Sequence, residues 1–142
     1  MEARGHVEES KLWLNSLRTL IWITDIGFIL YWTVTALKLI PPEYLYNDYT
    51  NPLLVSWNWS FMPLDLLISL TGLYSLSLHK QGRPVWAGWS LISLMLTFVS
   101  GLMAISFWSV RGEFDPLWWI PNLYLLLYPL LFIPRLIRLY AK

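Results

Sequence analysis

Cysteine is absent from the 142 residues of the chain, and charged residues make up only 13% of them. The missing thiols exclude disulfide bonds, a thiolate nucleophile and a cysteine metal site. Soluble domains carry about 25% charged residues, so this shortage of charge, together with 56% hydrophobic residues, indicates a membrane protein. The formal net charge is +1 and the chain has no basic stripe, which argues against nucleic-acid binding.

The sequence patterns of catalysis and metal binding are missing as well. His6 and His79 lie far apart, with no HExxH pattern, no metal-ligand spacing and no Ser-His-Asp arrangement. No glycine-rich phosphate loop is present, and no two carboxylates lie at short helical spacing. We therefore expect no cofactor, no metal and no enzymatic activity; a lipid-modifying enzyme is the alternative if acids or histidines converge at headgroup depth.

What the chain does contain is long apolar runs. Each run is long enough for a transmembrane helix of about 20 residues, and proline and glycine mark the turns between the runs. We predict an all-α integral membrane bundle, residues 19–142, with spans at about 19–40, 53–78, 85–110 and 117–139. A polar and amphipathic segment, residues 1–18, precedes the bundle.

The basic residues indicate how such a bundle is oriented. With four spans, only Lys38 and Arg111 fall on one side, and the other side holds Arg4, Lys11, Arg18, Lys80, Arg83, Arg135, Arg138 and Lys142. Because cytoplasmic loops are enriched in Lys and Arg, this distribution predicts that both termini are cytoplasmic.

The second run carries a carboxylate, Asp65, near its middle. An Asp at the centre of a membrane helix costs about 2.5–3.5 kcal/mol, so it is rarely left facing lipid. Asn58, Ser69 and Gly72 lie on the same side of the helix, which predicts that this side faces the interior. No lysine or arginine lies at the depth of Asp65, so burial favours its uncharged form. Asp65 can exchange a proton, bind a cationic ligand, or simply bond to a neighbouring helix.

Three further polar residues lie within the apolar runs. We expect Asn58 and Asn122 near the outer boundary, Asp65 near the midplane and Asp25 below it, so that together they outline a polar track. The alternatives are that the two asparagines only join helices, and that Asp25 reaches cytoplasmic water or pairs with Arg18.

Two tryptophans of the first run, Trp22 and Trp32, share the helix side of Asp25. An aromatic and acidic pocket of this kind suits an organic cation. The other interpretation is that they belong to the interfacial aromatic belt.

The third run has a face of small residues. Ser93, Thr97 and Gly101 recur every four residues, which lets another helix approach closely. Through such a face the protein could associate with a second copy of itself or dock on a larger membrane partner.

Five segments of the chain are distinctive: WITDIGF at 22–28, NP at 51–52, WNWSFMPLD at 57–65, GLMAISFW at 101–108 and WWIPNL at 118–123. With these segments the chain resembles the YvaD-like family of small four-helix membrane proteins from Bacillus-type bacteria. The resemblance covers about residues 18–138 and implies a bacterial plasma-membrane protein. It supplies no catalytic residues.

We therefore expect a non-enzymatic protein, in contact with the lipid bilayer, whose Asp-lined interior binds or translocates a small molecule, a cation or a proton. The alternative is an accessory or scaffold subunit that packs against a larger membrane partner.

Overall fold

The computed structural model describes residues 2–142. In this part of the chain there are no strands, and the elements are α1 (Glu2–Ala36), a short 3-10 turn η1 (Pro42–Tyr44), α2 (Pro52–Lys80), α3 (Trp86–Arg111) and α4 (Pro116–Tyr140). All four α-helices are long and apolar enough to cross a membrane. The prediction of an all-α fold with four long apolar helices is confirmed.

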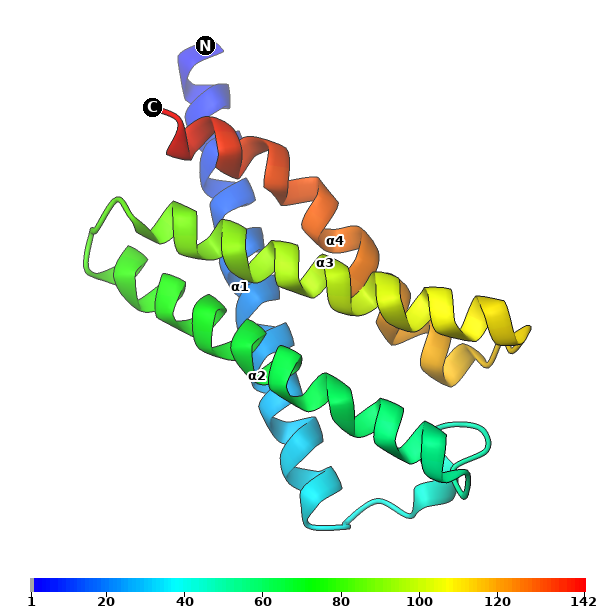
Figure 1. Ribbon diagram of the computed structural model, residues 1–142. Coiled ribbons are helices and arrows are strands. Elements are labelled where there is room, and N and C mark those ends of the chain that lie inside the picture. The colour runs from blue at the N-terminus through cyan, green and yellow to red at the C-terminus, as the bar shows by residue number, and fades with distance from the viewer. Residues whose placement is uncertain (1) are drawn as a thin grey trace.

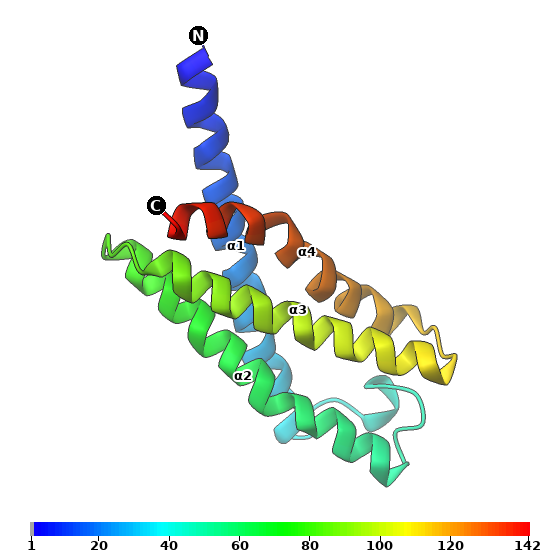
Figure 2. The ribbon, with the colours of Figure 1, turned by 45° about the horizontal axis from the view of Figure 1, so that its top comes forward.

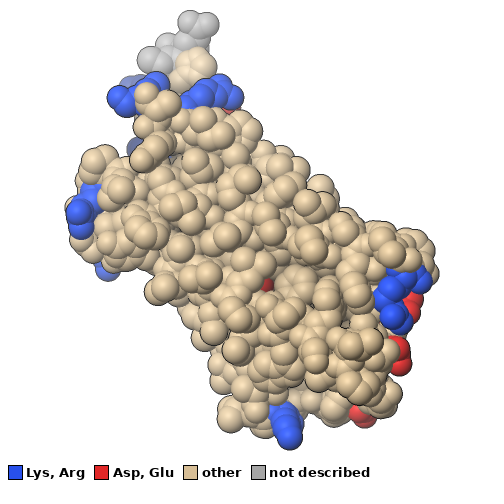
Figure 3. All heavy atoms as spheres, viewed as in Figure 1, with Lys and Arg blue, Asp and Glu red and all other residues tan. Residues whose placement is uncertain are grey.

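The helices form an elongated bundle with two distinct ends. Helices α2 and α3 run antiparallel side by side, α4 packs on α3, and α1 crosses α2 on the far side in Figure 1. Both termini and the α2–α3 turn lie at one end, which we call the termini end. The α1–α2 loop and the α3–α4 turn lie at the other, which we call the loop end. Charged side chains gather at the two ends, and the face between them is almost uncharged (Figure 3).

Helix α1 is longer than the other three helices and projects beyond them (Figure 2). At 1.5 Å per residue, its 35 residues extend over about 52 Å. The segment at 1–18, which the sequence predicts to be polar and amphipathic, is helical from Glu2 onward and forms the first part of α1. Its residues 4–12 are exposed. At the other end the helix stops at Ala36, four residues before the expected boundary at 40.

Local sequence explains where the helices begin and end. The side chains of Asn51 and Asp115 accept hydrogen bonds from the second backbone N–H groups of α2 and α4, and a proline follows each as the first helical residue. Lys38, Gly82 and Gly112 each have a positive φ and close α1, α2 and α3 with a Schellman pair of backbone hydrogen bonds. Glycine adopts a positive φ without strain, whereas Lys38 adopts it although its side chain makes this conformation less favourable.

Prolines inside the helices do not divide them. Helix α2 continues through Pro63, and α4 continues through Pro121, Pro129 and Pro134 while changing direction along its length (Figure 2). Each proline lacks an N–H group and so leaves one carbonyl of the preceding turn without its helical partner.

Helix α3 is the centre of the packing. Gly101 lies against the α4 backbone, because a Cβ added there would be 2.5 Å from the Leu126 nitrogen. Ser93 and Thr97 are buried. The small-residue face of α3 therefore packs inside the chain rather than outward. Two hydrophobic clusters complete the core: one around Leu17, Leu94 and Phe132, and one around Tyr46, Leu54 and Trp108.

Candidate functional site

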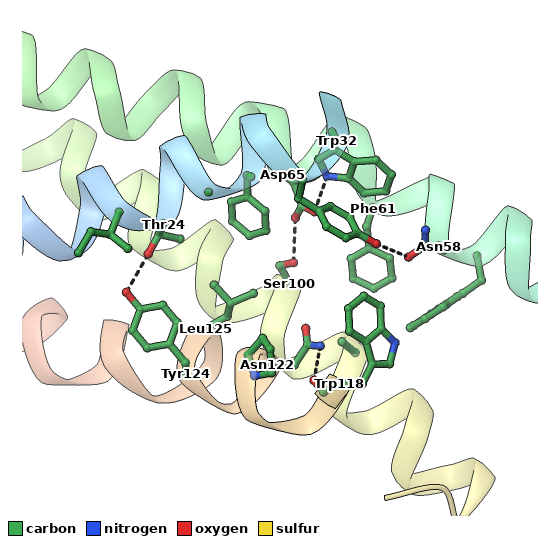
Figure 4. A pocket seen from close by; sticks show the side chains of 17 residues that line it. Thr24, Trp32, Asn58, Phe61, Asp65, Ser100, Trp118, Asn122, Tyr124 and Leu125 are labelled. Carbon is green, nitrogen blue, oxygen red and sulfur yellow. Dashed lines mark hydrogen bonds between the residues drawn. The ribbon is translucent and has the colours of Figure 1, made fainter. Parts of the chain in front are cut away.

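A cleft of about 290 Å³ opens among the four helices in the half of the bundle nearer the loop end. Helix α1 packs on α2, and α4 packs on α3, but α1 and α4 make little direct backbone contact. The cleft occupies the space that this arrangement leaves between α1 and α4, with α2 and α3 behind it (Figure 4).

One stripe of each long wall helix faces the cleft. The lining positions repeat at the three- and four-residue spacing of a helix surface. They include Thr24, Phe28 and Tyr31 of α1, Asn58, Phe61 and Asp65 of α2, and Trp118, Asn122 and Leu125 of α4, with Ser100 and Ala104 of α3.

The walls are rich in aromatic side chains. The rings of Tyr31 and Trp32 meet edge to face at 4.9 Å, and Tyr31 also approaches Trp118 across the cleft at 6.3 Å. Tyr124 of α4 also lines the cleft, and its hydroxyl lies 2.9 Å from the hydroxyl of Thr24 on α1. The Tyr31–Trp118 and Thr24–Tyr124 contacts join α1 to α4 through side chains.

Asp65 lies at the floor of this aromatic cleft. Its side chain is only 4% exposed, its Oδ2 accepts a hydrogen bond from Trp32 Nε1 at 2.9 Å, and its Oδ1 accepts one from Ser100 Oγ at 3.1 Å. An indole N–H can only donate, and each carboxylate oxygen can accept a second bond. The carboxyl group is thus held by two neutral donors, and no lysine or arginine lines the cleft.

Two amides flank the carboxylate. Asn58 Oδ1 accepts a hydrogen bond from the Tyr31 hydroxyl at 3.4 Å, and Asn122 Nδ2 donates to the backbone carbonyl of Trp118 at 2.8 Å. Within residues 2–142, no hydrogen bond occupies the Asn58 Nδ2 group or the Asn122 Oδ1 atom. One donor and one acceptor are therefore open to a ligand beside the acid.

Asp25 lies outside the cleft. It is 1% exposed, and neither carboxyl oxygen has a hydrogen-bond partner in the described chain. Gly72 makes room for this group, since an added Cβ would collide with the Asp25 carboxyl and lie 2.8 Å from Ser93 Oγ. Gly72 is seven residues beyond Asp65 on α2, so Asp25 lies about 10 Å nearer the termini end. It neither reaches the surface nor pairs with Arg18.

The structure thus divides the residues singled out by the sequence. Asp65, Asn58, Asn122 and Trp32 come together around one cleft. Ser69 instead donates a hydrogen bond to the backbone carbonyl of Asp25 at 2.8 Å. The side chain of Trp22 is 54% exposed and lies on another surface of α1.

Sequence reasoning missed several residues of the cleft. Ser100 was not among the predicted site residues, yet its hydroxyl donates a hydrogen bond to Asp65. The aromatic residues Tyr31, Phe61, Trp118 and Tyr124 also line the wall. Helical spacing could have identified two of them. Phe61 precedes Asp65 by four residues and Trp118 precedes Asn122 by four, so each aromatic residue lies on the same helix face as the polar residue that follows it.

A family model described as a family of unknown function, DUF5360, matches residues 17–142. The chain belongs to this family. It is also similar to the uncharacterized protein YvaD of Bacillus subtilis (strain 168), with 49% identity over 125 residues, which cover 88% of this chain and 94% of YvaD. The resemblance to the YvaD-like family is thereby confirmed. No solved structure matches the chain.

The match to DUF5360 includes the whole cleft. All of its lining residues, from Ile23 to Leu125, lie inside the matched segment, whereas most of the projecting start of α1 lies before it. The description of DUF5360 assigns no activity.

Proposed function

We propose that this chain is a multi-pass protein of the bacterial plasma membrane, with both termini cytoplasmic, that binds a small lipophilic cation in the cleft between α1 and α4. Four helices of sufficient length and hydropathy, and a relative from Bacillus subtilis, support the membrane and the bacterial setting. The excess of Lys and Arg in the segments at the termini end supports the orientation.

The observation that carries the proposal is the carboxylate of Asp65 on the floor of an aromatic cleft, held only by the neutral donors of Trp32 and Ser100. A cation that enters favours the ionised form of the Asp65 carboxyl, so that a proton is released and the two charges compensate each other. The cation also lies against the faces of the surrounding rings, which attract cations. A carboxylate buried within a membrane without a charged partner costs free energy, and such residues usually mark a binding site or an ion pathway.

The size of the cleft limits the ligand. Its volume of about 290 Å³ lies at the lower end of the range of about 300–1,000 Å³ for small-molecule sites. The ligand class we propose is therefore a compact aryl or alkyl ammonium rather than a large amphiphile.

Proton exchange is a second candidate activity, and a column of buried hydroxyls on α3 favours it. Ser90, Ser93, Thr97 and Ser100 are each at most 2% exposed and share one helix side. The column begins at the Ser100–Asp65 hydrogen bond and continues past the level of Asp25 to Ser90, which donates to Ser75 at 3.0 Å.

The packing favours a binding role over the two other roles considered. An accessory subunit that docks through the small-residue face of α3 is disfavoured, because Gly101 already lies against α4. A hydrolytic or lipid-modifying reaction is disfavoured, because no second acid lines the cleft beside Asp65.

Binding of benzyltrimethylammonium to the purified protein tests the proposal, with neopentylbenzene as its uncharged isostere and tryptophan fluorescence as the readout. We expect Asp65→Asn to weaken binding of the cation at least tenfold and to leave binding of the isostere unchanged. Asp48→Asn, which removes an exposed carboxylate from the α1–α2 loop, is the matched control and should bind like the wild type.

Equal affinity of the wild type and Asp65→Asn for the cation would overturn the proposal. For proton exchange, a pH-sensitive dye enclosed in liposomes reports the flux, which should fall in Asp65→Asn and in Asp25→Asn. A flux that both variants preserve would remove this second candidate.

A further inference from the structure

A second hollow lies between α1 and α2 at the termini end and shares no residue with the cleft. Its volume is about 750 Å³, and its walls are Asn15, Arg18, Thr19 and Trp22 of α1 and Leu73, Leu76, Ser77 and Lys80 of α2. On both helices the four positions have the spacing i, i+3, i+4 and i+7. Two complete helix stripes therefore face each other across this groove, which we call the basic groove.

The basic groove changes from polar to apolar along its length. Arg18 and Lys80 lie at its outer end, toward the termini end of the bundle. Trp22 lies one turn deeper than Arg18, about 6 Å along α1, and Leu73 lies about 10 Å deeper than Lys80 along α2. The cationic groups therefore lie nearer the termini end of the groove than the apolar side chains do, which is the order of charge and hydrocarbon in a phospholipid that enters from that end.

The two cations of the groove are not neutralised by the protein. In the part of the chain that the structure describes, the ion pairs are those of Arg111 with Asp48 and Glu113, and no acidic oxygen lies within 4.0 Å of the charged groups of Arg18 or Lys80. No acidic residue lines the groove. Trp22, which forms its deeper wall, has 54% of its surface exposed.

We propose that the basic groove binds an anionic phospholipid, with the phosphate between Arg18 and Lys80 and an acyl chain along Trp22, Leu73 and Leu76. Basic pockets between helices at the membrane surface attract anionic headgroups, and Ser77 and Asn15 add hydrogen-bonding groups beside the charges. A free phosphate would satisfy the cations but leave the apolar half of the groove empty. A lipid fills both halves.

Native mass spectrometry of the full chain in detergent tests the proposal, with phosphatidylglycerol and phosphatidylcholine of identical acyl chains as probes. We expect the wild type to retain phosphatidylglycerol roughly tenfold better than phosphatidylcholine. The double variant Arg18→Gln/Lys80→Gln should lose this preference. The matched control Arg138→Gln/Lys142→Gln removes two charges from the same end of the molecule and should keep it.

The proposal would be overturned if Arg18→Gln/Lys80→Gln kept the preference for phosphatidylglycerol over phosphatidylcholine. It would also be overturned if the control variant Arg138→Gln/Lys142→Gln lost this preference to the same extent. Inorganic phosphate separates the two sources of the anion. If phosphate alone displaces phosphatidylglycerol, the groove is an anion site and not a lipid site.

A second variant keeps the test valid if loss of charge disturbs folding. Ser77→Phe fills the basic groove without changing charge, and it should also release phosphatidylglycerol while thermal unfolding in lipid-free detergent stays as in the wild type. Undiminished lipid retention in Ser77→Phe would count against binding inside the groove.

Discussion

Gly101 allows α3 and α4 to pack backbone to backbone, and adding one methyl group there measures how tight this contact is. A Cβ at Gly101 would be 2.5 Å from the Leu126 nitrogen, 2.8 Å from the Asn122 carbonyl oxygen and 2.9 Å from the Leu125 carbonyl carbon. Ordinary contacts begin at 3.4 Å, so the α4 backbone must move by about 0.9 Å. Because backbone atoms cannot rotate away as a flexible side chain does, the two helices must separate.

The expected cost follows from two opposing effects. Overpacking a close contact costs about 1–3 kcal/mol, and replacing glycine by alanine inside a helix returns about 0.5–1 kcal/mol. We therefore expect Gly101→Ala to lower the free energy of unfolding by about 1–2 kcal/mol. Gly27 is the matched control, because a Cβ there meets nothing within 4 Å. Gly27→Ala should raise the free energy of unfolding by about 0.5–1 kcal/mol.

Thermal unfolding in detergent, followed by near-ultraviolet circular dichroism, compares the two variants. With about 2 kcal/mol between them, their Tm values should differ by roughly 5–8 °C for a chain of this size. If Gly101→Ala is as stable as Gly27→Ala, α3 and α4 do not pack as described, and the geometry of the cleft that depends on them is wrong.

Four further predictions concern buried polar groups. Asp65→Asn should lower the free energy of unfolding by about 1–3 kcal/mol, because an amide cannot accept hydrogen bonds at both positions. Asp25→Asn should cost less than Asp65→Asn in the same denaturation assay, since Asp25 has no hydrogen bond to lose in the described chain. The buried Ser75–Ser90 hydrogen bond should give a coupling energy of about 0.6 kcal/mol in a double-mutant cycle with alanine, and a value of zero would exclude the bond. Outside the spans, burial raises the pKa of the Tyr46 phenol above its usual value, so its contribution to stability is present below about pH 10 and falls as the pH rises further. At pH 11 the Tyr46→Phe variant should therefore keep more of its free energy of unfolding at neutral pH than the wild type does. If both proteins lose the same amount of unfolding free energy between neutral pH and pH 11, the prediction is refuted.

The number and type of the helices were predictable because apolar length and helix-ending residues are local properties of the chain. Four runs of sufficient length predicted four helices, and Pro41, Gly82 and Gly112 marked the turns. The extension of α1 back to Glu2 was not predicted, because polar residues that form a helix beyond the bundle leave no apolar signal.

The candidate site was only partly predictable. The cost of an acid in hydrocarbon indicated that Asp65 faces inward, and helical periodicity placed Asn58 on its side. Periodicity gave no means of knowing that Trp32 and Ser100 supply its hydrogen bonds, or that Asp25 lies behind Gly72 in a separate niche.

The amino-acid sequence by itself determined that the chain forms four apolar helices and which side of each helix is polar, because hydrophobic length and the 3.6-residue period act within a single helix. Only the tertiary structure decided which stripes face one another. The separation of α1 from α4 and the close approach of α3 to α4 at Gly101 depend on side-chain volumes summed over all four helices, and no single helix contains that information.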